Sequence, residues 1–245
     1  MEWKQRMRLD NIKQLKTDGF NVFASLPDMG KVGGLVSAYL AKNSKSECIA
    51  EIVSNEKPWV SYFDGIVKSV TDLYQLYYDK EHNLLIFTGN SQPQEPSELY
   101  QLCKIFLDHV QTIGRIRRLY SAGGYLRQHL TGAPMVCGVV SNPRLKQVLL
   151  DSGIDILSQE IKIITWFNGL ILGLAGDRNI EAIGLFGEIS ETTVPQPLAA
   201  KSILKAFAKI ESIQLDTKGL DKQYESILED IQKQKEPPSF RPGIG

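Results

Sequence analysis

Apolar and polar positions follow two different periods along this chain. Short continuous apolar runs, rich in β-branched and aromatic residues, are typical of buried strands, whereas apolar residues spaced three and four apart are typical of helices. The two patterns alternate through the body of the chain, which predicts an α/β fold with a mostly parallel sheet. The strand-like runs are 20–26, 48–53, 66–78, 84–88, 116–120, 135–140 and 182–187. The helix-like runs begin near residues 32, 97, 143, 197 and 220.

The run 66–78, a polar turn and the run 84–88 predict a hairpin, which adds antiparallel pairing. The first strand, its helix and the run 48–53 form a βαβ unit, which favours parallel strands. We expect one α/β domain over residues 1–215, a C-terminal amphipathic helix over 216–236 and a flexible tail over 237–245.

A glycine-rich turn joins the first strand to its helix. It contains Asp28, Gly30, Lys31, Gly33 and Gly34. Glycines let the backbone approach a ligand closely, and amides at a helix N-terminus can hold an anion. The phosphate-loop pattern needs Ser or Thr after Gly-Lys, and the dinucleotide pattern needs a different glycine spacing. The turn therefore has two interpretations: an anion site, or a tight turn that packs the helix on the sheet.

Other polar segments follow strands at the same predicted edge, where ligand sites of open α/β sheets are built. Paired carboxylates at Asp28 and Glu188 suit acid–base chemistry, and a Ser121–His129–Asp28 triad is conceivable, although the G-x-S-x-G elbow is absent. We assign no catalytic residue. The ligand candidates besides the glycine turn are Gly89, Asn90, Gln92, Ser121, Gly123, Gly124 and Glu188.

Composition narrows the function classes. The formal net charge is zero, so no bulk electrostatic attraction to nucleic acid or to an anionic membrane is expected. The three cysteines lie far apart, without metal-ligand spacing, which predicts no metal site and no disulfide framework. We also expect no cofactor. The polar N-terminus has no signal-peptide pattern and no run is apolar enough to cross a membrane, so we expect a cytoplasmic protein.

A narrow apolar stripe marks the predicted C-terminal helix. Its spacing of three and four residues produces one face suited to docking on the body or on a partner. The candidate contacts are Leu220, Tyr224, Ile227, Leu228 and Ile231.

The order and spacing of several segments resemble the proteasome assembly chaperone 2 family. The segments are 26–33, 85–93, 120–124, 134–142, 168–173 and 182–188, followed by the helix at 197–213. The resemblance implies a three-layer α/β/α fold similar to phosphorylase/hydrolase-like folds, self-association, and binding to proteasome α-subunits during ring assembly. It implies no catalytic residues. The chain ends in Arg241-Pro242-Gly243-Ile244-Gly245, which departs from the hydrophobic-Tyr-any ending of chaperones that dock in α-ring pockets.

The sequence supports three candidate functions. The leading one is a non-enzymatic, homo-oligomeric chaperone that recognises proteasome α-subunits. The second is a nucleotide- or phosphate-binding protein, or a hydrolase, that uses the cleft at the strand edge. The third is a homo-oligomeric scaffold.

Overall fold

The computed structural model describes residues 4–7, 19–53, 60–127, 132–158 and 161–235. Its strands are β1 (Lys4–Met7), β2 (Phe20–Ala24), β3 (Ser46–Val53), β4 (Val60–Phe63), β5 (Ile66–Ser69), β6 (Leu73–Asp79), β7 (Leu84–Gly89), β8 (Ile116–Leu126), β9 (Val136–Val140), β10 (Asp155–Ile156) and β11 (Ala182–Ile189). Its helices are the 3-10 turn η1 (Met29–Lys31), α2 (Val32–Asn43), α3 (Pro96–Ile113), α4 (Leu145–Asp151), α5 (Trp166–Asp177), α6 (Pro197–Glu211) and α7 (Lys218–Lys235).

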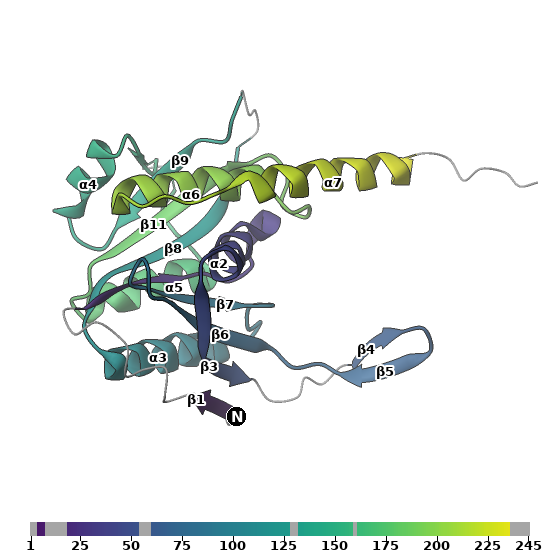
Figure 1. The fold of residues 1–245 in the computed structure, drawn as a ribbon, viewed down its shortest axis with the longest axis horizontal. Coiled ribbons are helices and arrows are strands. Elements are labelled where there is room, and N and C mark those ends of the chain that lie inside the picture. The colour runs from purple at the N-terminus through teal and green to yellow at the C-terminus, as the bar shows by residue number, and fades with distance from the viewer. Residues whose placement is uncertain (1–3, 8–18, 54–59, 128–131, 159–160, 236–245) are drawn as a thin grey trace, which may run out of the picture.

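One mixed sheet of nine strands forms the middle layer of the molecule (Figure 1). Its order is β1-β3-β6-β7-β2-β8-β11-β9-β10, and β7, β2, β8 and β11 at its centre run parallel. Helices α3 and α5 pack on one face, and α2, α4 and α6 pack on the other. The predicted three-layer α/β fold is confirmed.

The central strands are apolar on both sides because each side faces a helical layer. In β2, Val22 belongs to the core under α3 and α5, whereas Phe23 belongs to the core under α2 and α6. Phe23 meets the ring of Phe207 from α6 edge-on, with centroids 5.0 Å apart. The continuous apolar runs in the sequence therefore mark the strands that position the carboxyl edge of the sheet.

The structure differs from the predicted pairing in three places. The run 66–78 is not one strand: β5 pairs only with β4 in a separate two-stranded sheet, and β6 alone pairs with β7. Strands β2 and β3 run parallel as predicted, but β6 and β7 lie between them. Strand β8 continues through residues 121–126, which pair with β11 over their whole length, so Ser121–Gly124 is strand rather than loop.

The hairpin turn between β4 and β5 has a clear local cause. Asp64 and Gly65 both have positive φ values, 47° and 75°. Two consecutive residues of this kind form the tight hairpin turn for which Asp-Gly is a preferred sequence. This turn pairs β5 with β4 rather than joining it to β6, and the apolar pattern alone does not show it.

Two elements extend from the same side of the body: the β4–β5 hairpin and the distal part of α7 (Figure 1). Helix α7 confirms the predicted C-terminal helix, whereas the predicted tail at 237–245 lies outside the described residues. None of the helices in the described ranges combines the length and the apolar character needed to span a membrane.

Candidate functional site: a cavity at the carboxyl edge of the central strands

The glycine turn after β2 has an unusual backbone. Gly30 and Lys31 both lie in the left-handed region, at φ 61° and 53°. The Gly30 amide donates to the Thr192 carbonyl at 2.7 Å, and the Gly30 carbonyl accepts from the Gln196 amide at 2.9 Å. A Cβ atom at Gly30 would lie 2.6 Å from the Gln196 side chain. The turn is therefore packed against the segment that precedes α6.

The Asp28 carboxylate lies at the N-terminus of α2. Oδ1 accepts a hydrogen bond from the Gly33 amide at 2.7 Å, and Oδ2 accepts one from the Gly124 amide at 2.7 Å. A carboxylate at this position satisfies a helix N-terminal amide and interacts favourably with the helix dipole. The Gly33 amide, a candidate anion ligand in the sequence, is therefore bound by a carboxylate of the same chain.

The surroundings of Asp28 also change its acidity. Burial of the carboxyl group raises its pKa from 3.8 to about 6, and the hydrogen bonds from Gly33 and Gly124 offset part of that increase. Asp28 consequently changes charge close to neutral pH, unlike an ordinary aspartate.

Close packing explains the glycines of α2 and β8. A Cβ atom at Gly33 would lie 2.6 Å from the Ala122 and Leu26 carbonyl oxygens. A Cβ atom at Gly123 would lie 2.7 Å from Asp28 Oδ2. These positions allow the helix N-terminus, the turn and β8 to meet around the carboxylate.

Asn168 in α5 holds the turn from the opposite side. Its Oδ1 accepts from the Leu26 amide at 2.9 Å, and its Nδ2 donates to the Leu26 carbonyl at 3.0 Å. The buried backbone of Leu26 thus has both hydrogen-bonding groups satisfied by one side chain. The sequence analysis included Asn168 in the segment 168–173 but did not name it as a site residue; a lone amide in an apolar run is the signal that marks it.

The loop after β7 adds two more supports. Gln92 donates from Nε2 to the Pro27 carbonyl and accepts at Oε1 from the Phe167 amide at 2.9 Å. Asn90 accepts at Oδ1 from the Leu73 amide at 3.1 Å. Both predicted ligand residues therefore connect backbone segments of this chain.

Glu188 does not pair with Asp28. Its Oε1 accepts from the Tyr125 hydroxyl at 3.0 Å and from Arg127, and its Oε2 accepts from the Met135 amide at 3.0 Å. Burial raises the pKa of this carboxyl group, but the hydrogen bonds from Met135, Arg127 and Tyr125 outweigh burial and lower it. Glu188 joins β8, β11 and the segment before β9, and the prediction that it faces the Asp28 cleft is wrong.

Ser121 is fully buried inside β8. Its Oγ lies 3.4 Å from Ser25 Oγ, which accepts from the Ala122 amide at 2.7 Å. A serine without solvent access cannot meet an external substrate in this structure. The base considered for it, His129, lies outside the described residues. Within the described ranges, no group of three His, Cys, Asp or Glu residues is placed to hold a metal ion.

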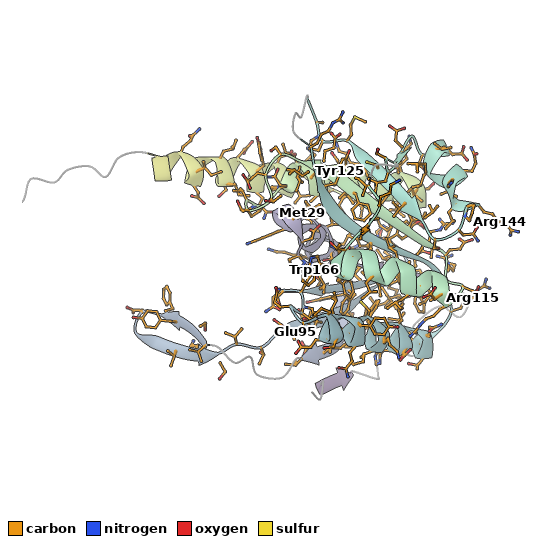
Figure 2. All side chains as sticks on the ribbon, turned by 180° about the vertical axis from the view of Figure 1, so that it is seen from behind. Met29, Glu95, Arg115, Tyr125, Arg144 and Trp166 are labelled. Atoms are coloured by element: carbon orange, nitrogen blue, oxygen red, sulfur yellow. The ribbon has the colours of Figure 1, made fainter. Side chains whose placement is uncertain are left out.

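A cavity of about 670 Å³ lies at this edge of the sheet. Met29, Tyr125 and Trp166, which line it, lie toward the side of the body from which the two extended elements project (Figure 2). Asp28 and Lys31 are the charged members of the described lining, which is otherwise polar or apolar. The lining residues are Pro27, Asp28, Met29, Lys31, Asn90, Ser91, Gln92, Gln94, Gly124, Tyr125, Leu126, Leu157, Ile161, Ile163, Ile164, Thr165, Trp166, Asn168 and Phe186.

The cavity brings together only part of the predicted site. Asp28, Lys31, Asn90, Gln92 and Gly124 line it. The other predicted ligand residues are not in its lining: Gly30, Gly33, Gly34, Gly89, Ser121, Gly123 and Glu188. The sequence analysis missed the apolar wall of the cavity, because its residues resemble ordinary core: Leu157, Ile161, Ile163, Ile164 and Trp166.

The residues of the predicted partner stripe on α7 differ in their exposure to solvent. Leu220 is fully buried in the protein's own core, so its assignment as a partner contact is wrong. Asp221 pairs with Lys201 of α6 at 2.5 Å, which fixes the start of the helix. Tyr224 and Leu228 are 36% and 40% exposed, farther along the helix.

Comparison with known proteins places these features in a family. The PAC2 family model matches residues 22–235. PbaB of Pyrococcus furiosus, described as an archaeal proteasome activator, is 26% identical, with a TM-score of 0.77 and coverage of 96% of this chain and 99% of that chain. PbaA of the same organism, described as an archaeal homologue of proteasome-assembly chaperone, is 18% identical, with a TM-score of 0.75 and coverage of 95% and 96%.

A curated relative supports the same grouping. Uncharacterized protein MJ1210 of Methanocaldococcus jannaschii is 26% identical over 217 residues, which cover 86% of this chain and 81% of that protein. The resemblance inferred from the sequence segments is confirmed by the family match. Since that match spans residues 22–235 of the 245, the chain belongs to the PAC2 family.

Proposed function

We propose that this protein is a non-enzymatic, self-associating chaperone or activator that recognises proteasome α-subunits through its surface. The observation that carries the proposal is the similarity to PbaB, which is 26% identical across 96% of the chain and is described as a proteasome activator. The description as a proteasome activator belongs to PbaB, and the proposal extends a proteasome-related role to this chain.

The chemistry of the cavity edge agrees with a binding role. The polar side chains of the turn region donate to or accept from the chain's own backbone: Asp28, Gln92, Asn168 and Glu188. By contrast, large apolar side chains stand uncovered nearby, including Ile163 at 75% exposure. Exposed apolar groups that gather in one region are typical of protein interaction surfaces.

Mixing the purified protein with proteasome α-subunits tests this function. We expect a complex at micromolar concentration, detected by isothermal titration calorimetry and analytical ultracentrifugation. Leu228→Glu places a charge on the exposed stripe of α7 and is expected to weaken the complex about tenfold or more.

Gln223→Glu serves as the matched control, because it adds the same charge to an exposed polar position of the same helix. It is expected to leave the affinity within about twofold of wild type. Failure of the wild-type protein to bind α-subunits at micromolar concentration would contradict the proposed function.

A second function, binding of a small ligand in the cavity, is favoured by one observation. Asp28, whose pKa is raised to about 6 by burial, lines a cavity of about 670 Å³, a size that accepts a small molecule. A thermal-shift screen with nucleotides, nucleosides and inorganic phosphate tests it, since ligand binding raises the melting temperature. A shift that Asp28→Asn removes supports this function, and no shift with any probe rejects it.

A further inference from the structure

The β4–β5 hairpin exposes an unusual amount of apolar surface. Phe63 is 84% exposed and Tyr62 is 72% exposed. Val60, Ile66 and Val67 are more than half exposed as well. An isolated two-stranded hairpin is marginally stable in water, because it has no hydrophobic face packed on another element. The hairpin therefore needs a partner surface.

The pairing register shows which shape that surface needs. Tyr62 lies opposite Val67, and Phe63 lies opposite Ile66. Because successive side chains alternate between the two faces of a strand, the two pairs lie on opposite faces near the hairpin turn. A tip that is apolar on both faces is covered by insertion into a hollow, whereas a flat surface would cover one face only.

The cavity at the carboxyl edge is such a hollow. Met29, Ile163 and Trp166 line it and are all exposed. Trp166 has a φ of 62°, a conformation that bulky residues rarely adopt. A large aromatic held exposed in this strained conformation is a feature of functional contacts rather than of folding.

We propose that the β4–β5 hairpin of one copy inserts Tyr62 and Phe63 into the carboxyl-edge cavity of a second copy, and that the second copy reciprocates. The hairpin and the cavity lie on the same side of the molecule, with the hairpin standing away from the body (Figures 1 and 2). Rotation of a second copy about a two-fold axis on that side brings each hairpin toward the other copy's cavity, as an isologous dimer requires.

Charge complementarity favours a second copy as the occupant. Asp64 occupies the hairpin turn beside Phe63, and Lys31 is the cation of the described cavity lining. Lys68 on the hairpin and Asp28 in the cavity provide a second pair of opposite charges. Opposite charges on two surfaces favour their association and disfavour partners of like charge.

The reciprocal arrangement also increases the surface area that is buried between the two copies. A specific interface buries about 800 Å² on each partner, and an aromatic side chain buries about 150–250 Å². One tip in one cavity is small on this scale, but each copy contributes a hairpin and a cavity, so the contact is made twice. The inference rests on the self-association in the proposed function and needs no proteasome.

A complementation experiment tests the exchange. Phe63→Glu removes the inserting group, and Ile163→Glu places a charge in the cavity wall; both positions are exposed, so both variants are expected to fold. Light scattering after size-exclusion chromatography is expected to show wild-type self-association, with each variant weakened about tenfold or more.

Mixing the two variants is expected to restore partial association. A heterodimer contains one intact contact: the wild-type hairpin of the Ile163→Glu copy in the wild-type cavity of the Phe63→Glu copy. Tyr100→Glu is the matched control, because Tyr100 is an exposed aromatic on α3 that does not line the cavity, and its association is expected to equal wild type.

Photocrosslinking identifies the occupant directly. The photoreactive analogue p-benzoylphenylalanine replaces Phe63 in unlabelled protein, which is mixed with ¹⁵N-labelled wild-type protein. We expect crosslinks from the unlabelled chain to the labelled segment 161–168.

Crosslinks confined to one chain would show that the hairpin covers its own cavity and would overturn the exchange. A monomeric wild-type protein, or unchanged association of Phe63→Glu, would overturn it as well. These outcomes are independent of the α-subunit experiment, so the two proposals fail separately.

Discussion

At Gly33, the absence of a side chain allows the start of α2 to pack closely against β8 and α5. Gly33→Ala would place a Cβ atom 2.6 Å from Ala122 O, Leu26 O and Asn168 Nδ2, none of which is a flexible chain end. We expect a loss of about 1–3 kcal/mol in the free energy of unfolding. Gly173→Ala, in α5, has open space around the added methyl group and is expected to gain about 0.5–1 kcal/mol. Urea denaturation measures both, and equal effects would contradict this account of the turn.

The raised pKa of Asp28 makes the free energy of unfolding fall as pH rises, whereas an ion-paired aspartate, whose pKa is lowered, makes it increase. Its pKa is about 6 in the folded state and near 3.8 in the unfolded chain, so between pH 4 and 6 the folded state binds more protons. The contribution of Asp28 to the free energy of unfolding therefore falls as pH rises through this window, by about 1.4 kcal/mol for each unit of pKa difference.

Comparison with Asp28→Asn isolates that contribution. We expect the stability advantage of wild type over the variant to grow as the pH is lowered from 7 to 4.5, measured by urea denaturation at each pH. An advantage that shrinks over the same interval would show that the folded-state pKa is not raised.

At the scale of elements, α7 is anchored by its first turn. Leu220 is fully buried, Asp221 pairs with Lys201, and the Gly219 amide donates to the Tyr39 hydroxyl at 3.2 Å. Leu220→Ala is expected to lower the free energy of unfolding by about 2–5 kcal/mol, because it removes a core side chain.

Leu228→Ala on the same helix is the matched comparison. Leu228 is 40% exposed, so its truncation is expected to change stability by less than about 0.5 kcal/mol. Thermal or urea denaturation of both variants checks the assignment. Comparable losses at the two positions would mean that the whole helix is packed on the body.

At the scale of the whole molecule, many of the exposed large apolar groups lie in the cavity lining, the hairpin and the distal part of α7 rather than over the faces of the sheet. The helical layers cover both faces of the sheet, whereas the carboxyl edge carries the cavity, the hairpin and α7 on one side (Figure 1). The two hydrophobic cores therefore lie under the helical layers, and the carboxyl edge is the region that the proposed interactions use. The association and complementation experiments address that edge directly.

Local patterns were sufficient for much of the fold. The continuous apolar run of β11 and the helical spacing of α3 and α6 are short-range properties, and their predicted and observed positions agree within a few residues. The hairpin 60–69 was missed because β5 and β6 together read as one apolar run over 66–78, and the Asp64-Gly65 turn precedes that run. The candidate site was predicted in part, since the carboxyl ends of neighbouring strands necessarily share an edge.

The amino-acid sequence by itself determined the α/β class, the glycine turn after the first strand and the membership in a family. Only the tertiary structure decided that the Asp28 carboxylate accepts a hydrogen bond from the Gly124 amide, that Glu188 turns toward Arg127, and that Ser121 is buried. The reason is physical: periodicity is set by residues a few positions apart, whereas these contacts join segments up to about a hundred positions apart, which meet only when the sheet has formed.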